Sequence, residues 1–370
     1  MKLNLFLSPP SFRFWCRIPL LLLAVFALFA GLWAGLVRLG WQIPQLSTTL
    51  VVNHGPLMIS GFLGTLIAIE RAVAISHFNR KYRITYISPL LSGLGAIALV
   101  FPVDPIFSRI LALLGAVGLF LIFMIIYRLQ PSTEHIIMGL ASLLWLIGNV
   151  LWLMGNPFFE VVPWWAGFLI LTIAGERLEL ARISIVKQLP RRIFLLIVGI
   201  LLFGFVMSLI AFKLGTFITG LSFVGLALWL LRFDIARYTI QQKGQTRYIA
   251  ACLLLGYIWL LVGGILWMMF GGRYLAGPIY DAMLHTIFIG FTFSMIFGHA
   301  LVIVPGVMGV QVRYSSVVYL PLGLLHAALV LRVIGDLKLN QILRQWGGMM
   351  NEVAIIMFIS LLIFLVIKRK

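Results

Sequence analysis

The stretch DAMLHTIFIGFTFSMIFGHALVIVPGVMG, residues Asp281 to Gly309, is almost wholly apolar, yet it contains two histidines, His285 and His299. A bilayer-spanning helix needs about 20 mostly apolar residues, so this run predicts a transmembrane helix. At about 1.5 Å and 100° per residue, the two imidazoles lie about 21 Å apart along an α-helix and about 40° apart around it. Ionisable side chains inside a bilayer are costly, and imidazole is the commonest metal-ligating side chain. The stretch therefore predicts one wall of a haem-type site.

The composition of the whole chain agrees with a membrane protein. Of its 370 residues, 62% are hydrophobic and 10% are charged, and the mean hydropathy is +1.10. The net charge of +18 is explained by orientation in the bilayer, because the basic residues lie between apolar runs, and nucleic acid is not an expected partner. Cys16 and Cys252 share no spacing motif, so neither a disulfide framework nor a cysteine-based metal site is predicted.

The hydropathy pattern predicts an all-α, polytopic membrane helical bundle of about twelve transmembrane helices. The connections between several spans are very short, so neighbouring helices are expected to be antiparallel and residues 1–370 to form one integral membrane domain. The predicted spans are residues 18–38, 48–75, 86–103, 106–127, 135–155, 161–180, 193–212, 214–231, 248–270, 281–309, 315–335 and 348–367.

The basic residues predict how the bundle is oriented. If the amino terminus faces the cytoplasm, the inner connections and the two termini contain 21 of the 28 Lys and Arg residues. Cytoplasmic loops carry an excess of Lys and Arg. Both termini are therefore expected to be cytoplasmic.

An internal repeat divides the predicted bundle into three units. GFLGTLIAIER at Gly61 to Arg71 and GFLILTIAGER at Gly167 to Arg177 agree in register, and GFTFSMIFGHA at Gly290 to Ala300 places a histidine where the others have glutamate. These segments lie on predicted spans 2, 6 and 10, which are four spans apart. The pattern predicts three four-helix arcs.

His54, in VVNHGPLMISGF, lies at the outer end of span 2, at the same predicted depth as His285 on span 10. Two neutral imidazoles on facing helices can occupy both axial positions of a haem iron, which suits electron transfer. His54 and His285 are therefore the predicted cofactor ligands. The alternative is an interfacial His54 bonded to Asn53 or to water, and Pro56 could kink the helix beside it.

Two further histidines are candidates for a second metal site. His299 lies toward the cytoplasmic side and His326 lies near the middle of span 11, where they could bind a second haem or a copper ion. Alternatively, His299 pairs with Glu70 or Glu176 at the inner ends of the sister helices.

The Glu-Arg pairs that end two copies of the repeat predict ion pairs between helices. Adjacent residues on a helix do not face each other. We therefore expect Glu70 to pair with Arg177 and Glu176 to pair with Arg71. Asp281 at the start of span 10 suits a helix cap, and it could instead orient His285.

The arrangement of these residues resembles a known superfamily. Twelve helices in three arcs, with axial ligands on spans 2 and 10, are similar to subunit I of the haem-copper oxidases. HGPLMISGF at His54 and HTIFIGFTFSMIFGHA at His285 look more particularly like NnrS, a family of haem- and copper-containing membrane proteins linked to nitric oxide metabolism and nitrosative stress. The resemblance implies a haem b cofactor bound by His54 and His285 in the plasma membrane.

The chain also departs from the active oxidases. They carry histidines on helices 6 and 7 for a second metal, and Val161 to Phe212 contains none. Nor does span 10 contain their closely spaced histidine pair. An oxygen-reducing terminal oxidase is therefore not expected, although another oxidoreductase activity is compatible with the site.

Three functions follow from these features. The first is a membrane haem protein that handles electrons or a small diatomic gas, with a redox partner that the sequence does not identify. The second is a proton-coupled secondary transporter without a cofactor, in which Glu70, Glu176 and His299 form the polar cluster. The third is an assembly or anchoring subunit of a redox complex.

Overall fold

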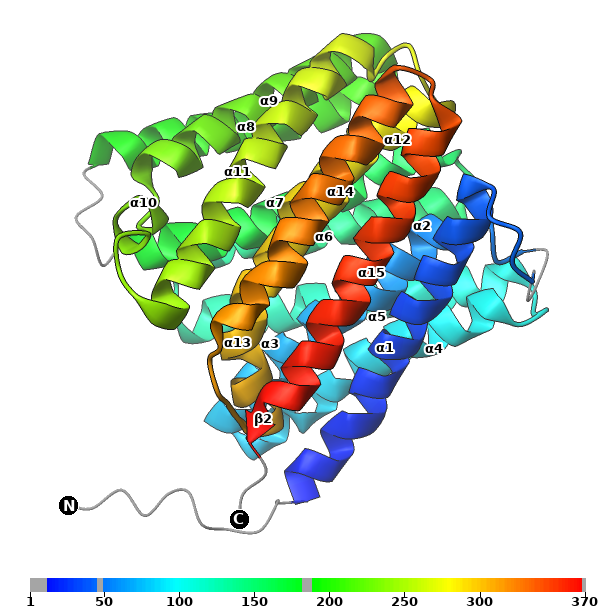
Figure 1. The fold of residues 1–370 in the computed structure, drawn as a ribbon. Helices are drawn as coiled ribbons and strands as arrows, with labels where there is room; N and C mark the ends of the chain where they lie inside the picture. The colour runs from blue at the N-terminus through cyan, green and yellow to red at the C-terminus, as the bar shows by residue number, and fades with distance from the viewer. Residues whose placement is uncertain (1–11, 45–48, 182–187, 368–370) are drawn as a thin grey trace.

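The computed structural model describes residues 12–44, 49–181 and 188–367 (Figure 1). In this part of the chain, twelve helices are long and apolar enough to cross a membrane. The elements are α1 (Phe12–Leu39), α2 (His54–Pro56), η1 (Leu57–Gly64), α3 (Thr65–Phe78), η2 (Arg80–Tyr86), α4 (Ile87–Val100), α5 (Pro105–Leu129), α6 (Thr133–Leu153), α7 (Phe158–Ala181), α8 (Gln188–Ile210), α9 (Phe212–Phe233), α10 (Ala236–Thr239), α11 (Gly244–Phe270), α12 (Gly277–His285), η3 (Thr286–Phe293), α13 (Ser294–Met308), β1 (Gln311–Val312), η4 (Ser316–Val318), α14 (Tyr319–Leu337), α15 (Gln341–Leu365) and β2 (Val366–Ile367).

The all-α polytopic bundle predicted from hydropathy is confirmed, and each predicted span matches one of the twelve helices. The start of α1 and the end of α15 lie at the same end of the bundle (Figure 1). There β1 and β2 pair antiparallel and tie the connection after α13 to the end of α15. Several basic residues counted for the orientation lie outside the described residues, namely Lys2, Arg182, Lys187, Lys368, Arg369 and Lys370.

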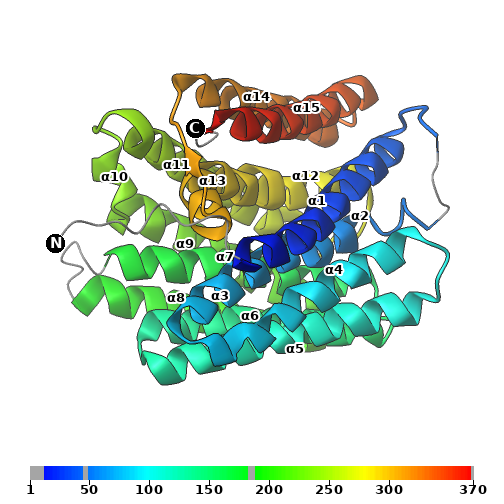
Figure 2. The ribbon, with the colours of Figure 1, turned by 90° about the horizontal axis from the view of Figure 1, so that it is seen from below.

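Three spans form the centre of the bundle. They are span 2 (α2, η1 and α3), span 6 (α7) and span 10 (α12, η3 and α13). Their most apolar windows are 67%, 78% and 61% buried, against 33–56% in the other spans. In Figure 2, α3, α7, α12 and α13 lie between α14 and α15 at the top and α5 at the bottom. The repeated segments thus mark the helices that share the central position.

Two of the central spans contain an unusual helical geometry. η1 and η3 are π-helices of eight residues each, a conformation that is rare and frequently found at functional sites. They occupy the same positions of the repeat, since Gly61 and Gly290 are each the fifth residue of their π-helix. Because η3 lies between His285 and His299, the ideal α-helical rise and rotation assumed for these two histidines are wrong.

Close backbone approaches hold the helical hairpins together. In the contact of α9 with α11, a Cβ on Gly264 would lie 2.8 Å from the backbone nitrogen of Val224 and 2.9 Å from the carbonyl oxygen of Gly220. A Cβ on Gly220 would similarly meet Gly264 O at 2.8 Å. Small residues at such contacts are the main device for packing helices in membranes, where the hydrophobic effect does not drive association.

Replacing Gly264 by Ala tests this contact. The added methyl group cannot fit without moving a backbone, so we expect a loss of about 1–3 kcal/mol in the free energy of unfolding. Gly199→Ala on α8 is the matched control, because its methyl group would enter open space. Unfolding in detergent, followed by circular dichroism, measures both. Equal stability of the two variants would contradict the proposed packing.

Candidate functional site

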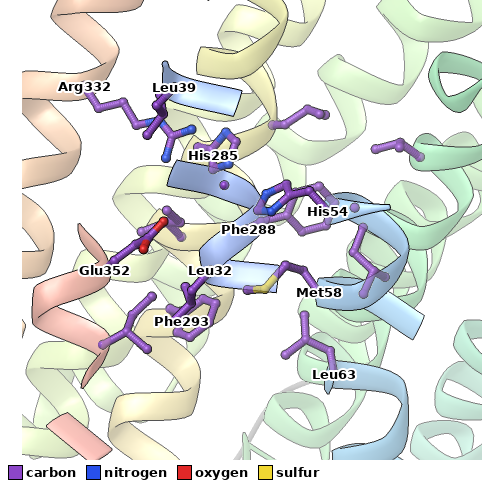
Figure 3. Close-up of a pocket in the computed structure, with 17 residues that line it drawn as sticks. Leu32, Leu39, His54, Met58, Leu63, His285, Phe288, Phe293, Arg332 and Glu352 are labelled. Atoms are coloured by element: carbon purple, nitrogen blue, oxygen red, sulfur yellow. The ribbon is translucent and has the colours of Figure 1, made fainter. Parts of the chain in front are cut away.

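The structure brings His54 and His285 together at the ends of spans 2 and 10 that lie opposite the start of α1 and the end of α15. Their ring centroids lie 6.2 Å apart and their planes are inclined by 25° (Figure 3). His54 is the first residue of the short helix α2, which leads into η1. His285 is the last residue of α12 and directly precedes η3. The two helices therefore present their histidines to one another at a similar depth.

The hydrogen bonds of the two rings determine which ring nitrogen has a lone pair free to bind a metal. Nδ1 of His54 lies 2.8 Å from the carbonyl oxygen of Gly31 on α1, and Nδ1 of His285 lies 2.8 Å from the carbonyl oxygen of Asp281. A carbonyl oxygen accepts and cannot donate, so Nδ1 must carry the proton in both rings. In the neutral imidazole this leaves the lone pair on Nε2, as in metal-binding histidines.

The alternative of a His54 held by Asn53 does not match the contacts. The amide of Asn53 donates instead to the carbonyl oxygen of Leu99 at 3.0 Å. Pro56 is helical, with φ −55 and ψ −41, and the chain continues from it into η1. The proline therefore does not break the helix beside His54.

A largely apolar hollow surrounds the two imidazoles (Figure 3). Its walls include Met58, Phe288 and Phe293, and its open space is about 90 Å³. Small-molecule sites usually measure roughly 300–1,000 Å³, so a larger flat ligand would require flexible lining side chains to turn aside. Gly55 also lines the hollow, and a Cβ there would meet nothing within 4 Å.

Charged side chains close one side of this hollow. Arg332 donates to Asp281 Oδ2 from Nε at 3.0 Å and from Nη2 at 2.8 Å, and Asp281 Oδ1 lies 3.2 Å from His285 Nδ1. The expectation that Asp281 caps its helix is wrong, because α12 begins at Gly277 with Ala276 as its N-cap. Asp281 instead contacts the imidazole and anchors a buried arginine. Arg344 extends the cluster, with Nε 2.7 Å from Asp336 Oδ1.

Glu352 on α15 is a wall residue that the sequence analysis missed. Its carboxylate points toward the hollow in Figure 3. A Cβ on Gly35 would lie 3.1 Å from Glu352 Oε1 and 3.2 Å from His54 Cε1, so glycine keeps room between the carboxylate and the ring. An acidic residue in an apolar helix was a usable signal, but no motif linked it to His54.

A second hollow, of about 120 Å³, lies between spans 2, 6 and 10. Glu70, Glu176 and His299, the three equivalent residues of the repeat, all line it. The nearest polar contact of His299 is the bond of its Nδ1 to the carbonyl oxygen of Met295 at 2.7 Å. Leu63 lines this hollow and also the one around His54 and His285, so the two spaces adjoin.

The ion pairs of the repeat are partly those expected. Arg71 bonds to Glu176 across the helices, as predicted, and it also lies 3.3 Å from Glu70. The predicted pair of Glu70 with Arg177 is wrong. Arg177 instead forms two bonds to Asp234, of 2.7 and 3.0 Å, with both side chains buried. Asp234 follows α9 directly, where the chain turns back into the protein.

His299 and His326, the candidate ligands of a second metal site, have different neighbours, and metal binding by either histidine stays a prediction. His326 accepts a hydrogen bond from Trp259 Nε1 at 2.8 Å on its Nδ1 and does not line the hollow of His299. Across the described residues, no cluster of three or more His, Cys, Asp or Glu side chains is placed to hold a metal ion. His299 and His326 are thus separate histidines in different surroundings.

Comparisons with known proteins give a family for the chain. A family model described as "Domain of unknown function (DUF8744)" matches residues 17–367. No curated protein and no solved structure matches. The matched range includes the twelve spans, His54 and His285.

The buried pair of Arg177 and Asp234 offers a test of the inner contacts. Asp234→Ala would leave a buried guanidinium without its partner, which typically costs about 3–5 kcal/mol. Glu70→Ala is the matched control and should cost much less, because Arg71 retains Glu176. A double-mutant cycle should couple Arg177 to Asp234 and not to Glu70. Coupling of Arg177 to Glu70 alone would contradict this arrangement.

Proposed function

Because the chain belongs to the DUF8744 family, whose description names no activity, we propose from its geometry that it is a membrane haem protein. In this proposal His54 and His285 hold a haem b between spans 2 and 10. The protein then handles electrons, or a small diatomic gas such as nitric oxide, in the plasma membrane. The resemblance of the two histidine segments to NnrS supports the choice of this chemistry.

The observation that carries the proposal is the pairing of the two imidazoles. Metal–nitrogen bonds of about 2 Å on opposite sides of one metal hold two ring centroids about 6 Å apart. The rings of His54 and His285 lie 6.2 Å apart, and each directs its Nδ1 proton to a carbonyl oxygen. The spacing of the two rings and their Nδ1 protons support the proposal that both would hold one haem.

The number of protein ligands also favours a tetrapyrrole over a bare ion. Structural and catalytic ions such as zinc generally take three or four protein ligands. A haem supplies four nitrogens itself and needs at most two side chains. Two imidazoles with no third ligand among the described residues thus suit haem.

The surrounding residues have roles that do not depend on the redox chemistry. When bound, the haem would supply a one-electron couple. Gly31 and Asp281 fix the two imidazoles, and Arg332 neutralises Asp281. His54 and His285 would both hold the haem, and the apolar side chains around them would limit the access of water to it. These features favour electron transfer.

A second haem or a copper ion at His299 or His326 has a weaker basis, because each histidine stands alone. A specific observation favours a second candidate function, proton-coupled transport. Glu70, Glu176 and His299 line one hollow at the centre of the bundle, as a polar transport site would require.

The cytoplasmic placement of both termini belongs to the proposal and rests on the distribution of Lys and Arg.

The visible spectrum of the detergent-purified protein separates these functions. We expect sharp low-spin bands in the reduced-minus-oxidised spectrum and about one haem per chain in a pyridine haemochrome assay. Metal analysis of the same sample should report iron and would reveal copper. A folded but colourless and metal-free protein would sink the haem proposal and favour transport.

Histidine variants locate the site. His54→Ala and His285→Ala should each lose most of the haem while the protein remains inserted and monodisperse. His135→Gln is the control, because His135 is a buried histidine bonded to the carbonyl oxygen of Gln130 outside the hollow. Added imidazole should partly restore the spectrum of His285→Gly. A full haem complement in the His285→Ala variant would refute the assignment.

A further inference from the structure

A small basic concavity lies at the end of the bundle where α11 begins, beside α10 (Figure 1). It is lined by Lys243, Gly244, Arg247, Tyr314 and Tyr319, and its volume is about 280 Å³. Two of the five residues are cationic, two carry phenolic hydroxyls, and none is acidic. The chemistry of this lining suits an anion with several oxygen acceptors.

The concavity is built by segments far apart in the sequence. Gly244 starts α11 with φ +65, a left-handed conformation that favours glycine, and this turn places Lys243 and Arg247 on one rim. Tyr314 lies in the connection that leads into α14, and Tyr319 is the first residue of α14. Both rings pack against Tyr248, with centroids 6.5 and 5.1 Å away. The tyrosine wall is therefore fixed by a buried residue behind it.

The position of the concavity identifies the occupant. Two membrane spans begin beside it, Gly244–Phe270 and Ser316–Leu337, so it lies at the level of the lipid headgroups. Next to Tyr319, Leu320 is 66% exposed and Val317 is 46% exposed, which provides an apolar surface for acyl chains. Basic pockets between transmembrane helices recognise anionic headgroups, and tyrosines favour this interface.

We propose that this concavity binds the phosphate headgroup of an anionic phospholipid, with Lys243 and Arg247 as the charged contacts and Tyr314 and Tyr319 as hydroxyl donors. The acyl chains then lie on the apolar surface at the start of α14. The inference is independent of the haem, because none of these residues lines either central hollow. It assigns to the fold a bound lipid that joins α11 to α14.

Native mass spectrometry of the delipidated full chain tests the proposal with phosphatidylglycerol and phosphatidylcholine as probes. The wild type should retain phosphatidylglycerol in preference to phosphatidylcholine. Lys243→Gln combined with Arg247→Gln should weaken phosphatidylglycerol binding about 30-fold, at about 1 kcal/mol per cation, and leave phosphatidylcholine unaffected. Both side chains are exposed, so the variant should fold.

The matched control is Arg80→Gln combined with Arg83→Gln. These exposed cations lie in η2, outside the concavity, and the variant has the same change in charge. An equal loss of phosphatidylglycerol in the control would show general charge attraction and overturn the site. Displacement of the lipid by excess inorganic phosphate would show a soluble anion as the ligand and would also overturn it. Retention of lipid by the Lys243/Arg247 variant would do the same.

Discussion

A hydrocarbon core leaves no water for backbone N–H and C=O groups, so each must find a partner within the protein. Both histidine-bearing spans meet this constraint with a departure from the α-helix. In η1 the carbonyl oxygen of Ser60 accepts a bond from Ser92 Oγ at 2.7 Å, and in η3 the carbonyl oxygen of Gly290 accepts one from Ser294 Oγ at 2.5 Å. Hydroxyls thus supplement the backbone bonds of both π-helices.

Charged side chains inside the bundle must also find partners within the protein. Arg177 is paired with Asp234, Arg332 with Asp281 and Arg71 with Glu176, each across helices or across a turn. A paired buried charge is tolerable, whereas an unpaired one costs several kcal/mol. Glu352 and the paired imidazoles line the hollow instead, which distinguishes this site from a network of ion pairs.

Hydropathy predicted the twelve spans because burial in lipid requires long apolar runs, whatever the packing. The pairing of His54 with His285 was also predictable, since both histidines lie at the starts of spans 2 and 10, which run in the same direction and therefore place them at a similar depth. The partner of Arg177 could not be predicted from the sequence. Asp234 lies at a helix end, and its approach depends on how the chain turns after α9. The separation of His299 from His326 likewise depends on helix rotation, which hydropathy does not encode.

The π-helices were invisible for a different reason. TIFIGFTF and LMISGFLG are ordinary apolar sequences, and their equivalent positions in the repeat become meaningful only when the backbone is known. The copy on span 6 remains α-helical, so the three units have diverged in geometry as well as in the change from glutamate to His299. As a result, two carboxylates and one imidazole line the hollow around His299. The hollow around His54 and His285 takes one imidazole from each of two units. Leu63 borders both spaces, and Phe293, which lines the hollow around His54 and His285, stacks on Phe62 at 6.0 Å. Movement of a small molecule between the two hollows would therefore have to pass this apolar neck, whose side chains come from the same two spans as the paired histidines.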